Sequence, residues 1–147
     1  MIYTVTFSPA LDYTMWFDQI KAGELNRALK TSFRPGGKGI NVSAVLKNLG
    51  FDSVCLGFAA GFAGREILSQ MNRLGLRQEF IWLEEGCSRI NVKVKAREET
   101  ELNASGPPIT NQALTALRER IGRLKKEDIL VISGNPPMGT KETIYRD

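Results

Sequence analysis

Strand-like and helix-like patterns alternate along the 147 residues of the chain. Solidly apolar runs, typical of strands buried on both faces, occupy residues 53–58 and 128–133. A β-rich segment at 2–7 and a short apolar segment at 80–84 are also expected to be strands. Apolar residues recur three and four positions apart, as on one side of a helix, over residues 40–50, 63–74 and 110–124. This alternation of strands and helices predicts an α/β fold.

Each helical segment has a predicted buried stripe. The stripes are Val42, Val45, Leu46 and Leu49 in the first, Ile67, Leu68, Met71 and Leu74 in the second, and Leu114, Leu117, Ile121 and Leu124 in the third. Gly50 and Gly75 are expected to end the first two helices, and Thr110 to cap the start of the third. A loop at 134–139 and a helix beginning within 140–147 are expected to follow, and we interpret the chain as the N-terminal part of a longer protein.

Residues 89–97 follow a different pattern, in which apolar and polar side chains alternate strictly. Such alternation predicts a strand with one face in water, outside a sheet that helices cover on both faces. Residues 13–34 also contain more β-forming residues than the central sheet needs. We therefore expect a small accessory sheet, with strands roughly within 13–34 and 89–104, attached to the α/β core.

Composition narrows the possible chemistry. The net charge is +4 with lysines and arginines dispersed, so no nucleic-acid surface is expected, and no apolar run approaches the ~20 residues of a membrane span. The first residues form a strand pattern without an export signal, so we expect a cytoplasmic protein. Cys55 and Cys87 lack metal-ligand spacing, so we expect reduced cysteines and no metal site. The absence of histidine excludes a Ser-His-Asp triad and leaves carboxylates, cations and backbone amides.

A glycine-rich loop, RPGGKGINVS at residues 34–43, precedes the first predicted helix. A Walker A loop requires Ser or Thr after the lysine, but Gly39 follows Lys38. The dinucleotide pattern G-x-G-x-x-G fails because Val42 occupies its third glycine position. Two interpretations remain: a turn that only starts a helix, or a loop whose missing side chains let a ligand approach helix amides, Lys38 and Asn41.

Several motifs in order along the chain resemble those of the ribokinase-like (PfkB) sugar kinases. They are TVTFSPALD, GGKGINVS, SRINVKV, TELNASGPPI, ILVISGNPPMG and TIYRD. The resemblance covers essentially the whole chain, and the nearest branch is similar to bacterial 1-phosphofructokinases and tagatose-6-phosphate kinases. It implies that residues 1–147 form the N-terminal part of one kinase domain, with a three-layer α/β/α core and a small β-sheet lid.

The resemblance also implies a sugar site. Asp12 would accept hydrogen bonds from sugar hydroxyls, and Gly36, Gly37, Lys38 and Asn41 would line the site. Arg89 would contact the phosphate already on the sugar, with Lys38 and Arg27 as further cations. Asn91 and Asn103 are weaker candidates. The lid would cover the sugar and form the interface of a homodimer.

The implied reaction is ATP-dependent, Mg²⁺-assisted phosphorylation of a ketose phosphate, with fructose 1-phosphate the expected acceptor and tagatose 6-phosphate the alternative. The family's catalytic aspartate lies in a Gly-Ala-Gly-Asp segment, and residues 1–147 contain no such segment. The chain is therefore expected to hold the sugar half of the kinase and to be inactive alone. A non-catalytic sugar-phosphate-binding module is the alternative if the chain is complete.

Overall fold

The computed structural model describes residues 1–134 of the protein. Its elements, in order, are β1 (Ile2–Thr6), β2 (Ala10–Trp16), β3 (Lys30–Gly36), α1 (Lys38–Asn48), β4 (Ser53–Ala60), α2 (Gly61–Arg73), β5 (Arg77–Leu83), β6 (Arg89–Lys95), β7 (Glu99–Asn103), α3 (Asn111–Ile121) and β8 (Ile129–Ile132). Each strand and helix predicted within these residues is present. The loop predicted at 134–139, beyond its first residue, and the helix predicted within 140–147 lie outside the described residues.

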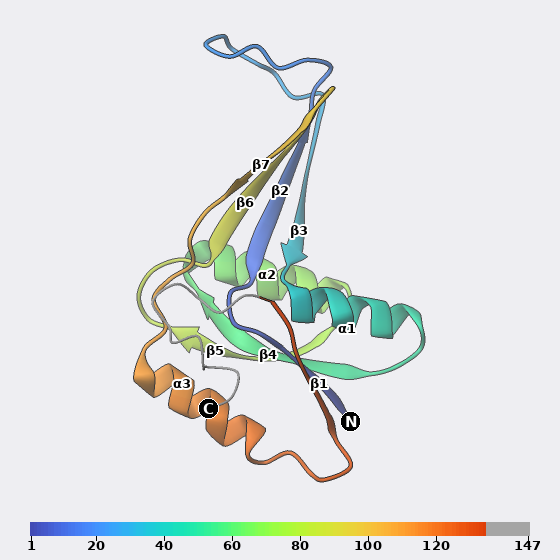
Figure 1. Ribbon diagram of the computed structural model, residues 1–147, viewed down its shortest axis with the longest axis vertical. Helices are drawn as coiled ribbons and strands as arrows, with labels where there is room; N and C mark the ends of the chain where they lie inside the picture. Colours follow the sequence, from blue (N-terminus) through green and yellow to red (C-terminus); the bar gives the residue numbers. More distant parts are fainter. Residues whose placement is uncertain (135–147) are drawn as a thin grey trace.

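Four of the strands form a parallel sheet in the order β5-β4-β1-β8 (Figure 1). Of these strands, β4 is buried along its whole length, with α2 on one side and α3 on the other, as a solidly apolar run predicts. The edge strand β8 is equally apolar but leaves Ile129 and Ile132 56% and 39% exposed. Side chains of β4 point alternately to the two sides: Leu56 and Phe58 pack with Leu117 of α3, whereas Cys55 packs with Ile67 of α2. The expected three-layer α/β/α core is therefore confirmed.

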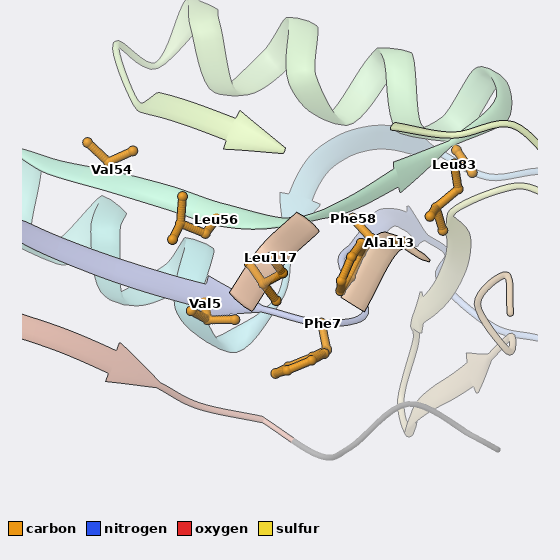
Figure 2. Close-up of a cluster of buried hydrophobic side chains, with 9 residues drawn as sticks. Val5, Phe7, Val54, Leu56, Phe58, Leu83, Ala113 and Leu117 are labelled. Atoms are coloured by element: carbon orange, nitrogen blue, oxygen red, sulfur yellow. The ribbon is translucent and has the colours of Figure 1, made fainter. Parts of the chain in front are cut away.

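The α3 side of the sheet is held by a cluster of buried side chains from four elements and the loop after β1 (Figure 2). Phe58 of β4 lies beside Phe7, with ring centroids 6.0 Å apart. The start of α3 is capped as predicted, since Thr110 Oγ1 accepts a hydrogen bond from the Ala113 N–H at 3.2 Å. Leu117 is fully buried on α3, as its stripe predicted.

The predicted buried stripe of α1 is wrong in two positions, because Val45 and Leu49 are 57% and 66% exposed. The helix instead rests on the sheet through three residues near its start, Gly39, Ile40 and Ser43. The Ser43 hydroxyl hydrogen-bonds the hydroxyls of two strands, Thr4 Oγ1 at 2.8 Å and Ser53 Oγ at 2.9 Å. Hydropathy periodicity misses a contact built from one apolar side chain, a glycine and a hydroxyl group.

In α2 the predicted buried stripe is only partly right. Ile67 and Met71 are buried as expected. Leu74, however, is 56% exposed, because it lies at the C-cap, where the helix ends, and not on its packed side. Gly75 then adopts a positive φ of 68°, the conformation that ends helices.

The remaining four strands form the expected accessory sheet, in the order β3-β2-β6-β7. This sheet, called the lid below, rises from the core as a long narrow blade (Figure 1). The β2–β3 and β6–β7 pairs are antiparallel, and the central β2–β6 pair is parallel. Because β2 follows β1 after only three residues, the base of the lid lies at the carboxyl end of the parallel sheet.

The two faces of the lid differ in chemistry. On one face, the register aligns Phe33, Tyr13, Val92 and Leu102 across the four strands. On the other face, one residue along, it aligns Arg34, Asp12, Asn91 and Asn103. The lid therefore has an apolar face and a polar face, as the alternation in β6 predicted.

Candidate functional site

The polar row at the base of the lid brings three of the expected site residues together. Asp12 of β2 lies opposite Asn91 of β6, and Asn91 lies opposite Asn103 of β7. Asp12 and Asn91 are 79 positions apart in sequence and meet only because β2 and β6 pair. In α/β sheets, ligands bind outside the carboxyl ends of the parallel strands, which is where this row lies.

The Asp12 carboxylate is held from two sides. Asn91 Nδ2 donates a hydrogen bond to Asp12 Oδ1 at 3.1 Å, and Lys93 Nζ lies 3.2 Å from Asp12 Oδ2. The Asp12 side chain keeps 21% of its surface exposed. On a third side, a Cβ built on Gly36 would lie 2.7 Å from Asp12 Oδ2. Gly36 is therefore required because any side chain there would displace the carboxylate.

Asn91 contains an acceptor without a partner. Its side chain is buried, with 7% exposed, and Oδ1 has no hydrogen-bond partner among the described residues. A buried acceptor left unpaired costs about 1–3 kcal/mol. A bound hydroxyl would satisfy it, so this atom indicates a ligand that donates hydrogen bonds beside Asp12.

The other two glycines of the loop serve the packing of α1 against β1. A Cβ on Gly39 would lie 2.6 Å from the Val5 carbonyl oxygen, and a Cβ on Gly37 would lie 2.5 Å from Thr6 Cγ2. Gly37, at the N-cap, has no side chain to cap the helix, and Thr6 Oγ1 accepts the Ile40 N–H at 3.1 Å instead. The glycines thus combine both interpretations: Gly37 and Gly39 allow close helix packing, and Gly36 makes room for Asp12.

Two expected cations border the same end of the lid. Lys38 is the first residue of α1, and its side chain lies against Gly134 after β8, where a Cβ would be 3.4 Å from Lys38 Cγ. Arg89 begins β6, and its Nε donates to the Ser8 carbonyl oxygen at 3.3 Å. Asn41 lies in the first turn of α1 with its side chain exposed. The positive potential of the α1 N-terminus adds to these cations.

Arg27 does not join this group within one chain. It lies in the loop between β2 and β3, at the far tip of the lid (Figure 1). The strands extend from Asp12 to Trp16 before that loop begins, which is about 13 Å at 3.3 Å per residue. The expected grouping of Arg27 with Lys38 and Arg89 is therefore not found in the single chain.

Three residues of the site were not predicted. Arg34 lies opposite Asp12 on β3, and Lys93 contacts Asp12 directly. Ser133, after β8, has a buried hydroxyl without a partner among the described residues. Lys93 and Lys95 occupy equivalent positions in the alternation of β6, so the sequence pattern does not distinguish them. The strand register places Lys93 nearer than Lys95 to Asp12.

Neither a metal site nor a membrane segment is found in the part of the chain that the structure describes. No group of three or more His, Cys, Asp or Glu residues within 1–134 could hold a metal ion. No helix among these residues is long and apolar enough to cross a membrane.

Solved structures that are similar to this chain in both architecture and sequence include phosphofructokinases. Escherichia coli phosphofructokinase-2 in complex with fructose-6-phosphate superposes with a TM-score of 0.90 at 27% identity, over 98% of this chain and 48% of that one. The core and lid are thus the N-terminal half of the ribokinase-like fold. The model of the pfkB family of carbohydrate kinases matches residues 5–147, and the chain belongs to this family.

Curated relatives include two kinds of sugar-phosphate kinase. A 1-phosphofructokinase of Borreliella burgdorferi is 39% identical, over all of this chain and 48% of its own length. A tagatose-6-phosphate kinase of Staphylococcus epidermidis is 31% identical, again over all of this chain and 48% of its own. The chain spans about half the length of these relatives.

Proposed function

We propose that the protein binds a ketose phosphate at the base of the lid and takes part in its ATP-dependent phosphorylation, with fructose 1-phosphate converted to fructose 1,6-bisphosphate. The observation that carries this proposal is the unpartnered Asn91 Oδ1 beside the Asp12 carboxylate. The Asn91 Oδ1 atom and the Asp12 carboxylate oxygens accept hydrogen bonds, and sugar hydroxyls can donate them. Arg89 and Lys38 supply positive charge for the phosphate already on the sugar.

The residues of this chain would bind and orient the acceptor. Asp12 and Asn91 fix the hydroxyls, and the polar face of the lid shields them from water, which would otherwise accept the phosphoryl group. We infer ATP and Mg²⁺ as donor and metal from membership of the family. Residues 1–134 contain no metal-ligand cluster, so no residue is assigned to either. Residues 1–147 also lack the Gly-Ala-Gly-Asp segment, so this chain alone would bind without transferring phosphate.

Tagatose 6-phosphate is the second candidate acceptor, supported by the relative at 31% identity. Calorimetric titration with each ketose phosphate separates the candidates. We expect tighter binding of fructose 1-phosphate, and a loss of binding of about tenfold or more in Asp12→Asn, as for a charged hydrogen-bond partner. Asp18→Asn, in the exposed loop of the lid, is the matched control. Absence of binding of both sugar phosphates would refute the proposal.

We further propose a homodimer formed through the apolar face of the lid. Phe33 and Leu102 on this face are 47% and 58% exposed, and Tyr13 stacks on Phe33 with ring centroids 4.3 Å apart. A second copy packed there would cover these side chains. Arg27, at the lid tip, would then contact a sugar phosphate only across the dimer. The two free cysteines fit a reducing cytoplasm.

A further inference from the structure

Lys93 is the cation in direct contact with Asp12, although it lies one row away from it in the lid. On the polar face, the register places Lys93 of β6 level with Thr14, two residues beyond Asp12. Its side chain extends back diagonally, so that Nζ lies 3.2 Å from Asp12 Oδ2. Diagonal neighbours in a sheet are within reach of a long side chain. The next lysine on the same face, Lys95, pairs instead with Glu99.

A second carboxylate holds Lys93 in place. Glu101 of β7 lies opposite Lys93, with its Oε1 3.7 Å from Nζ. Burial lowers the pKa of Lys93, but the hydrogen bond and charge of Asp12, together with Glu101, outweigh it, so the pKa is raised above its ordinary value. The ammonium therefore keeps its charge, and three strands of the lid are joined through it.

The contacts to Asp12 leave room for a ligand. A carboxylate offers about four lone-pair positions. Asn91 occupies one on Oδ1 and Lys93 one on Oδ2. One position on each oxygen remains, enough for two hydroxyl donors. Without Lys93, only Asn91 would restrain the carboxylate, which could then rotate about its terminal bond.

We propose that Lys93 is a positioning residue that orients the Asp12 carboxylate for hydroxyl recognition, with Glu101 holding Lys93 from the opposite strand. The role of Asp12 in binding a ketose phosphate rests on the proposed function. The orientation of Asp12 by Lys93 can be tested without any sugar.

The first experiment follows the Asn91 side-chain amide by ¹⁵N NMR in the ligand-free protein, because its Nδ2 donates to the same carboxylate. Lys93→Met removes the charge at nearly constant length, Lys93→Arg restores it, and Lys95→Met is the matched control on the same strand and face. We expect the Asn91 amide signals to move in Lys93→Met and to stay near their wild-type positions in Lys93→Arg and Lys95→Met. Unchanged Asn91 signals in Lys93→Met would overturn the proposal.

The second experiment measures binding of fructose 1-phosphate to the same variants by calorimetry. Lys93 is about one-third exposed, so water screens its ion pair with Asp12. We therefore expect Lys93→Met to weaken binding of fructose 1-phosphate about tenfold. Lys93→Arg should recover most of the loss. Equal losses in Lys93→Met and Lys95→Met would overturn the proposal. If the wild type binds no ketose phosphate, the proposed function fails, and the Asn91 signals still decide the role of Lys93.

Discussion

The glycine loop can be tested by adding one methyl group at a time. In Gly39→Ala the new Cβ would lie 2.6 Å from the Val5 carbonyl oxygen, where ordinary contacts are 3.4 Å or more. Val5 belongs to β1, which has β4 on one side and β8 on the other, so it cannot easily move. Overpacking of this kind costs about 1–3 kcal/mol, and the higher helix propensity of alanine recovers up to about 1 kcal/mol.

The expected net effect of Gly39→Ala is a loss of about 1–2 kcal/mol in the free energy of unfolding. For a chain of this size, that corresponds to a melting temperature lower by roughly 2–8 °C. Gly122→Ala is the control, because Gly122 has a φ of −63° and its Cβ would lie 3.3 Å from the Arg118 carbonyl oxygen, a much milder contact than that at Gly39. We expect this control to melt close to the wild type by circular dichroism.

Gly36→Ala should behave differently, because its Cβ would meet only the Asp12 carboxylate, a side chain that can move. Its melting temperature should stay close to that of the wild type, while its affinity for a ketose phosphate falls about tenfold through the displaced Asp12. The packing explanation would be refuted if Gly39→Ala unfolded with wild-type stability and lost only ligand affinity. In that case Gly39, like Gly36, would be needed for ligand binding and not for helix packing.

Three further predictions concern the phosphate, the lid and pH. Arg89→Ala should weaken binding of a ketose phosphate about tenfold but not binding of the unphosphorylated sugar, as measured by calorimetry; equal losses for both would contradict a phosphate role. Phe33→Glu should give a monomer in sedimentation equilibrium, whereas Ser32→Glu on the polar face should keep the dimer; a dimer in both would contradict the proposed interface. Two hydrogen bonds lower the pKa of Asp128 below its ordinary 3.8. The larger effect comes from the N-terminal ammonium of Met1, and the next from the Lys125 N–H. This stabilisation is present above pH 3.8 and is lost as pH falls through the lower folded-state pKa. Asp128→Asn should therefore lower the melting temperature at pH 7, and this effect should shrink as the pH is lowered below 3.8; an effect that does not change with pH would contradict it.

The fold was predictable because burial on both faces of a sheet leaves a strong mark on sequence. The solid apolar runs of β4 and β8 and the alternation of β6 correctly separated the core sheet from the lid. The contact of α1 with the sheet was not predictable in this way. Gly39, Ile40 and Ser43 make that contact. Val45 and Leu49, which fit the period, are exposed. Periodicity detects repeated apolar side chains, whereas this contact combines a single buried apolar side chain, Ile40, with the small Gly39 and the paired hydroxyl of Ser43.

The sequence predicted which residues belong to the candidate site better than it predicted the contacts between their side chains. Asp12 and Asn91 could be named from motifs, but their hydrogen bond depends on the parallel pairing of β2 with β6, which no local pattern specifies. Lys93 and Lys95 are equivalent in the alternation of β6, and only the diagonal geometry of the lid gives one of them Asp12 and the other Glu99. The roles of residues two positions apart thus diverge through tertiary structure alone.

The three glycines of the loop link the lid to the core through neighbouring contacts. Gly36 ends β3 against Asp12, Gly37 lies at the N-cap of α1 against Thr6, and Gly39 lets α1 lie on the Val5 carbonyl. Because β1 supplies both Thr6 and Val5 and leads directly into β2, the strand that holds Asp12 is fixed relative to α1 at both ends of the loop. A ligand between Asp12 and the N-terminus of α1 would therefore meet groups whose spacing is set by the core.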